Sequence, residues 1–103
     1  MIRAEFFESK GKLCGFRLCG HAGFAESGED IVCASVSSAV QLTANLLEAL
    51  KYEQKVDVMD NVIKLHLNAS DDTSDVVLDQ LRMHLEAVLE EFPNTIKITT
   101  TEV

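Results

Sequence analysis

Residues 2–19, IRAEFFESKGKLCGFRLC, carry the clearest folding signal in the chain. Polar and apolar side chains alternate over residues 2–9 and again over residues 13–19, which is the pattern of β-strands. The Lys-Gly-Lys sequence at 10–12 lies between the two runs and supplies a turn, because glycine adopts backbone conformations that other residues avoid. The stretch therefore predicts a β-hairpin, whose first strand tolerates a position at the edge of a sheet.

The chain beyond this hairpin predicts a loop, a helix and a second hairpin. Residues 20–29 contain three glycines and read as a loop. Apolar residues then recur at helical spacing, which predicts a helix over 30–50. Residues 55–60 and 62–68 read as two strands joined tightly at Asp60-Asn61.

The last third of the chain predicts a second helix and a final strand. Residues 71–75, Asp-Asp-Thr-Ser-Asp, place acids and hydroxyls where a helix N-terminus needs them, and Pro93 and Asn94 stop the helix after about Phe92. Residues 95–101 form the final strand. The order ββαββαβ favours an α+β fold: a two-layer sandwich with a mostly antiparallel sheet of about five strands and two helices on one face. The other face of the sheet must be polar or buried against a second copy.

Composition indicates a single globular domain over residues 1–103. The chain has 9 Lys and Arg against 17 Asp and Glu, which gives a net charge of −8. This balance argues against direct nucleic-acid binding and against a basic helix lying on an anionic membrane. We expect no membrane-spanning stretch, no signal peptide and no cofactor. A basic protein or peptide is the partner that the charge favours.

The three cysteines indicate a reducing, cytoplasmic environment, because their number is odd and their spacing fits no disulfide framework. Cys14 and Cys19 are expected to be packing residues that point to opposite faces of a strand. His66 and His84 are expected to be solvated. No spacing of cysteines and histidines predicts a metal site.

The segment Gly20-His21-Ala22-Gly23-Phe24-Ala25-Glu26-Ser27-Gly28-Glu29-Asp30-Ile31-Val32-Cys33 carries the clearest chemical signal. If Asp30 caps the helix, Cys33 is its third residue, and its thiol lies at the positive end of the helix dipole, which favours the nucleophilic thiolate. His21 could take the proton and return it to a leaving amine. The first backbone N–H groups of the helix, including that of Cys33, could stabilise an oxyanion.

Simpler interpretations stand beside this one. A cysteine near a helix start is often a small apolar core residue, and a histidine between glycines is often just solvated. Gly20, Gly23 and Gly28 allow a loop to fold over a peptide, but glycines also serve turns. The acidic run of residues 71–91 fits either a solvated helix face or a surface that steers a basic partner. A non-catalytic acidic binding module therefore remains an alternative, as does a thiol redox sensor with Cys14 or Cys19 as the resolving cysteine.

Two blocks of this segment, Gly-His-Ala-Gly-Phe-Ala and Gly-Glu-Asp-Ile-Val-Cys-Ala, resemble the ribosomal-processing cysteine protease family, called Prp. The resemblance also covers the length of the chain and the ββαββαβ order. It implies that His21 is the general base and Cys33 the nucleophile.

The resemblance further implies a substrate and an assembly. The substrate would be the N-terminal extension of a large-subunit ribosomal protein, the twenty-seventh in the usual naming, cut after an aromatic pair. The protein would be a homodimer whose glycine loop moves when the peptide binds. Asp30 and Ser37 match further family positions, and Phe24 would contact the aromatic residues of the substrate or anchor the loop.

Overall fold

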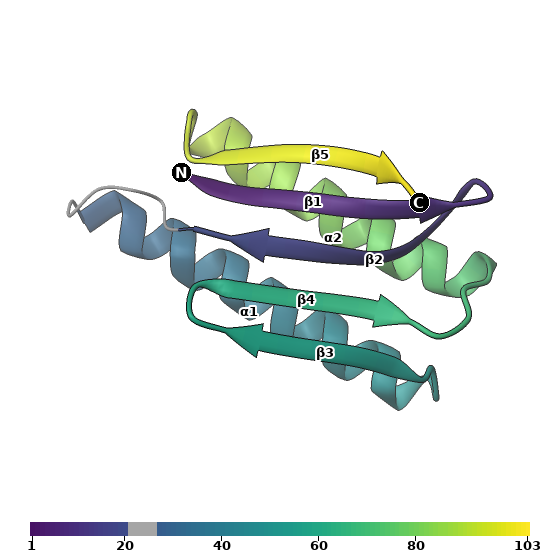
Figure 1. Cartoon of the computed structure of the whole chain (residues 1–103). Helices are drawn as coiled ribbons and strands as arrows, with labels where there is room; N and C mark the ends of the chain where they lie inside the picture. The colour runs from purple at the N-terminus through teal and green to yellow at the C-terminus, as the bar shows by residue number, and fades with distance from the viewer. Residues whose placement is uncertain (21–26) are drawn as a thin grey trace.

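The computed structural model describes residues 1–20 and 27–103 (Figure 1). Along these residues the elements are β1 (Ile2–Ser9), β2 (Lys12–Cys19), α1 (Ser27–Ala49), β3 (Gln54–Met59), β4 (Val62–Leu67), α2 (Asp72–Glu91) and β5 (Ile96–Glu102). This succession confirms the predicted ββαββαβ order. The helix α1 differs at its start, because it begins three residues before Asp30.

The strands form one sheet in the order β3-β4-β2-β1-β5. β1 pairs in parallel with β5, and the other neighbouring pairs of described strands are antiparallel. Both helices cover the same face of the sheet, with α1 behind β3 and β4 and α2 behind β1 and β2 (Figure 1). The predicted α+β sandwich is thus confirmed, but β1 lies inside the sheet rather than at its edge.

The core lies between the sheet and the two helices. Phe6 of β1 and Phe16 of β2 face each other across the strand pair, with ring centroids 6.2 Å apart, and neither ring is exposed. The helices contribute Val32, Leu47, Leu78 and Leu85, each fully buried. These apolar residues recur at strand and helix spacing, so burying them fixes which face of each element points inward.

The start of α2 follows the predicted capping chemistry. The Asp71 carboxylate accepts a hydrogen bond from the backbone N–H of Ser74, and the Ser74 hydroxyl accepts one from the backbone N–H of Asp71. The first of these bonds, aided by the Tyr52 hydroxyl 2.6 Å away, lowers the pKa of Asp71. Asp75 in the first turn accepts a bond from the backbone N–H of Leu13 at 2.8 Å, which ties α2 to β2.

The open face of the sheet is polar, the first of the two possibilities that the sequence allows. Its one well-covered aromatic is Phe7, which stacks on His66 with ring centroids 5.0 Å apart. Gly15 lies between them in register, where a Cβ would collide with the carbonyl oxygen of Leu65. His66 is therefore half-buried rather than solvated, and this burial lowers its pKa.

The helix α1 is more apolar than the sequence led us to expect. Its residues Ile31–Ala49 have a mean hydropathy of 1.3, which is sufficient by length and composition for a membrane span and corrects the expectation that no stretch qualifies. Val32, Val36 and Val40 of this stretch are buried in the core. The opposite side of the helix is mixed, because it exposes Leu42 and Leu46 beside polar residues such as Asn45.

Candidate active site

The chain leaves the sheet at Gly20, directly after β2. Gly20 has φ +91, and a Cβ at this position would lie 2.6 Å from the carbonyl oxygen of Met1. Its backbone N–H donates to the carbonyl oxygen of Asn61 in the β3–β4 turn at 3.1 Å. Any residue with a Cβ would therefore be strained at position 20. The hydrogen bond of Gly20 also links the end of β2 to the tip of the β3–β4 hairpin.

The position of Cys33 in α1 corrects one prediction. Because α1 begins at Ser27, Asp30 belongs to the first turn instead of capping the helix, and Cys33 lies in the second turn. The free backbone N–H groups of a helix belong to its first turn, so the N–H of Cys33 is not one of them. The Cys33 N–H is therefore not one of the predicted oxyanion donors, and the prediction now concerns only the N–H groups of the first turn of α1.

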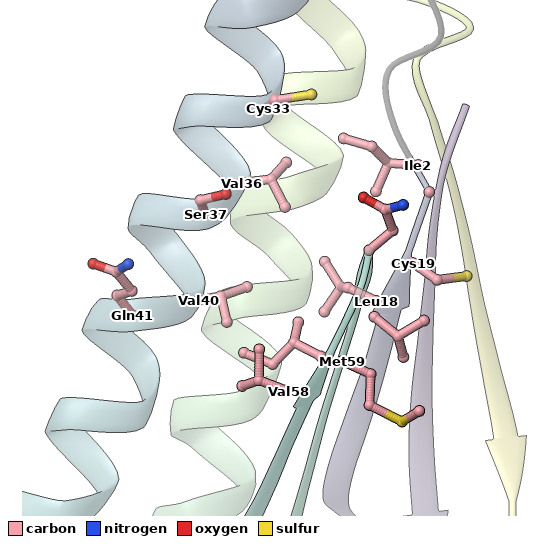
Figure 2. A pocket seen from close by; sticks show the side chains of 14 residues that line it. Ile2, Leu18, Cys19, Cys33, Val36, Ser37, Val40, Gln41, Val58 and Met59 are labelled. Carbon is pink, nitrogen blue, oxygen red and sulfur yellow. The ribbon is translucent and has the colours of Figure 1, made fainter.

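Cys33 borders a pocket of about 340 Å³ between α1, the end of β2 and the β3–β4 hairpin (Figure 2). The thiol is half-buried, and it points from α1 toward the sheet. Val36 and Ser37 follow it one turn further along the helix, and Val40 and Gln41 one turn after that. The remaining lining residues come from the strands and their turns: Ile2, Leu18, Cys19, Gly20, Val58, Met59, Asn61, Val62 and Ile63.

The structure brings together three of the residues singled out in the sequence. Gly20, Cys33 and Ser37 all line this pocket. Gly28 and Asp30 belong to the first turn of α1. The predictions for His21, Gly23 and Phe24 concern residues outside those that the structure describes.

The strand residues of the pocket were not anticipated. Val58 and Asn61 come from a hairpin whose turn was predicted, but nothing in the sequence indicates that its tip lies beside Cys33. Period-two alternation could have shown that Val58 shares a strand face with Val56. It could not have shown which helix that face meets.

The side chains of the other two cysteines are directed elsewhere, although Cys19 also lines the pocket. The Cys19 side chain points away from α1 (Figure 2), and its sulfur lies 3.7 Å from Nη1 of Arg17 on the open face of the sheet. Cys14 lies at a β-bulge, where its thiol donates to the carbonyl oxygen of Phe7 and burial raises its pKa. All three cysteines are free. Within residues 1–20 and 27–103, no three His, Cys, Asp or Glu side chains are grouped to hold a metal ion.

A half-buried thiol on a helix, opening into an apolar pocket of a small α+β domain, fits a thiol-dependent enzyme. The comparison with known families specifies the class: the chain belongs to the family described as Cysteine protease Prp, whose model matches residues 1–97, and it is a cysteine protease.

Individual relatives agree with this assignment. The ribosomal processing cysteine protease Prp of Bacillus subtilis (strain 168) is 25% identical, with 97% of each chain covered. The protein of the same name from Staphylococcus aureus (strain Mu50) is 28% identical, with 86% of this chain and 88% of the relative covered.

Solved structures share the fold. The crystal structure of SMU.848 from Streptococcus mutans has a TM-score of 0.82 at 30% identity, covering 100% of this chain and 96% of the other. The Prp protease of S. aureus in complex with a covalently linked product peptide has a TM-score of 0.86 at 23% identity, covering 98% of this chain and 100% of the other.

Proposed function

We propose that the protein hydrolyses a peptide bond with Cys33 as nucleophile and His21 as general acid and base. The observation that carries this proposal is the Cys33 thiol at the edge of the pocket. His21 takes the proton of the Cys33 thiol, and the resulting thiolate attacks the scissile carbonyl carbon and forms a C–S bond. The C–N bond then breaks as His21 gives the leaving amine its proton. His21 next takes a proton from water, which attacks the thioester, breaks the C–S bond and releases the acid product.

The proposed substrate is the N-terminal extension of the twenty-seventh large-subunit ribosomal protein, cut after an aromatic pair. Membership in the Prp family and the names of its relatives support this proposal. The net charge of −8 adds electrostatic support, because ribosomal proteins are basic and an acidic enzyme attracts them. Gly20 and Gly23 would let the segment before α1 fold over the peptide, and Phe24 would contact the aromatic residues of the peptide or anchor this segment. Gly28, Asp30 and Ser37 belong to α1 and would lie beside the bound peptide.

A processing assay tests this function. The protein is incubated with the ribosomal protein that carries its extension, and mass spectrometry of the product locates any cut. We expect a single cut after the aromatic pair with the unsubstituted protein and an intact precursor with His21→Ala. A precursor that stays whole with the unsubstituted protein would reject this substrate. A cut that persists in His21→Ala would reject the role of His21.

We also propose that the protein is a homodimer of the cytoplasm, paired through the outer surface of the helices. Three free cysteines fit a reducing compartment. The open face of the sheet is charged, whereas the outer helical surface exposes Leu42, Leu46, Val76 and Met83. Pairing would remove this apolar surface from water at a gain of roughly 25 cal/mol for each Å².

The dimer proposal predicts the effect of introducing charge on the outer helical surface. The unsubstituted protein should have a solution mass of twice 11.4 kDa by light scattering. Leu42→Glu combined with Leu46→Glu should give a monomer of 11.4 kDa, because burying two carboxylates costs several kcal/mol. The control, Thr99→Glu on the open sheet face, should remain dimeric. A dimer that survives the leucine substitutions would place the interface elsewhere.

A further inference from the structure

The open face of the sheet has the opposite charge to the protein as a whole. Strand alternation places one basic residue of each strand on this face, the side away from the helices: Lys55 of β3, Lys64 of β4, Arg17 of β2, Arg3 of β1 and Lys97 of β5. The same strands place two acids there, Glu5 and Asp57, although the chain contains 17 acidic residues. The face turned toward the reader in Figure 1 is therefore basic on an acidic protein.

Two pairs of like charges lie side by side on this face. In register, Arg17 of β2 is opposite Lys64 of β4, and Arg3 of β1 is beside Lys97 of β5. Directly opposite side chains have Cβ atoms only about 5 Å apart, so like charges at such positions destabilise a sheet. An anion bound between the two cations removes this repulsion. Two such pairs on neighbouring strands favour a partner with several anionic groups.

The acids on the face leave these cations available. Glu5 lies in register beside Arg17, but its carboxylate accepts a hydrogen bond from the Thr101 hydroxyl at 2.7 Å. The Lys64 ammonium group lies 5.9 Å above the Phe7 ring. Among the side chains that the structure describes, no ion pair includes a basic residue of this face. The basic groups are therefore free to contact a partner.

The layout of the face fits an extended anionic chain. Neighbouring strands are about 4.8 Å apart, so the cations extend across roughly 20 Å of sheet instead of gathering at one point. The Phe7 ring is covered by His66, which leaves the face mostly polar. A phosphate backbone needs cations and hydrogen-bond donors, and the exposed hydroxyls of Thr99 and Thr101 on β5 supply further donors. A polar surface of this kind suits phosphates better than a peptide, which would bring apolar side chains to bury.

We propose that the open face of the sheet binds RNA through its phosphate backbone, without reading the base sequence. The net charge of −8, which argues against nucleic-acid binding when taken alone, is an average over the chain that conceals this face. The proposal goes beyond peptide cleavage and does not depend on Cys33. If the substrate is a ribosomal protein, this face would hold the enzyme on the RNA to which such proteins bind.

RNA binding is measured by fluorescence anisotropy with a labelled oligouridine of about 20 nucleotides in about 50 mM KCl. We expect a Kd of about 10⁻⁴ to 10⁻⁶ M, and a plot of log K against log salt concentration with a slope of about −2 to −3.5, as contact with three to five phosphates requires. Absence of RNA binding would overturn the proposal. A polyglutamate of equal charge that binds as tightly would assign the face to an acidic protein instead.

Arg17→Gln combined with Lys64→Gln should lower the affinity for the oligouridine at least about 10-fold and make the salt slope shallower by about 1.4, because two phosphate contacts are lost. The matched control is Lys10→Gln combined with Lys51→Gln, which changes the net charge equally but lies in the β1–β2 turn and after the end of α1. The control should keep its affinity within about 2-fold. Equal losses in both variants would show that only net charge matters, and would overturn the role of the face.

A second pair, Arg3→Gln combined with Lys97→Gln, makes the test independent of how any one variant folds. It should lower the affinity for the oligouridine as the first pair does, with circular dichroism confirming the fold of each variant. Unchanged RNA affinity in both face variants would overturn the proposal. Peptide cleavage should persist in all of these variants, since none of the substituted residues lines the pocket beside Cys33. RNA binding and cleavage can therefore fail separately.

Discussion

Cys33→Ala is expected to lower kcat/KM for peptide cleavage by at least about 1,000-fold, because losing the nucleophile of a covalent mechanism removes the thioester pathway altogether. The substitution deletes one half-buried sulfur atom, so the fold should persist. The measurement is the rate of product formation with a peptide spanning the scissile bond, together with the thermal unfolding midpoint of each variant.

Cys14→Ala and Cys19→Ala are the matched controls for this substitution. Cys19 faces the open side of the sheet, and Cys14 donates to the carbonyl oxygen of Phe7 at a bulge, so neither thiol borders α1 as Cys33 does. Cys14→Ala should cleave within about 2-fold of the unsubstituted protein. Cys19 lines the pocket, but its side chain points away from α1, so Cys19→Ala should keep the cleavage that Cys33→Ala loses. A Cys33→Ala variant that still cleaves, or a Cys19→Ala variant that does not, would assign the chemistry to another group. A thiol redox sensor needs a resolving cysteine, so replacing Cys14 and Cys19 together should abolish a redox response while leaving cleavage intact.

Phe6→Ala should produce the largest loss of stability, about 3–5 kcal/mol in the free energy of unfolding. Phe6 is fully buried on β1, between the neighbouring strands β2 and β5, and its ring lies against that of Phe16. Truncation removes apolar contacts and leaves a cavity that the surrounding strands cannot close. Urea unfolding followed by circular dichroism measures the change.

Phe6→Leu is the control, and it should cost less than about 2 kcal/mol because most of the apolar volume is kept. A loss for Phe6→Ala no larger than that for Phe6→Leu would show that this site collapses around the smaller residue. It would also mean that the β1–β2 pair is less central to the core than its burial indicates.

The elements with strong local signals were predictable from the sequence. The opening hairpin follows from alternation on both sides of Lys10-Gly11-Lys12, and Lys10 and Gly11 have the positive φ that such a turn requires. The start of α2 follows from Asp71 and Ser74, which form a capping box. In both cases the deciding interactions join residues that are close in the sequence.

The start of α1 was misplaced for a local reason. Gly28 is a poor helix former, and Asp30 is a good cap, so propensity alone favours a later start. The helix nevertheless begins at Ser27, which moves Cys33 from the first turn to the second. This shift removes the predicted oxyanion role of the Cys33 N–H, although the candidate nucleophile itself is unchanged.

The pocket was not predictable because it depends on sheet order. Periodicity shows which side chains of a strand share a face, but it does not show which strands are neighbours. The order β3-β4-β2-β1-β5 places the tip of the second hairpin beside Gly20 and Cys33, and Val58 thereby joins a site 25 positions earlier in the chain. For the same reason the sequence showed only that the first strand tolerates an edge, whereas β1 lies inside the sheet between β2 and β5.

The central claim is that Cys33 forms a thioester with the substrate, and trapping this intermediate tests it most directly. The protein is mixed with the peptide, quenched in acid within milliseconds to seconds, digested and examined by mass spectrometry. We predict a transient adduct on the fragment containing Cys33, with the mass of the N-terminal product less one water. Cleavage with no adduct at any early time, or an adduct on Cys14 or Cys19 instead, would contradict the claim.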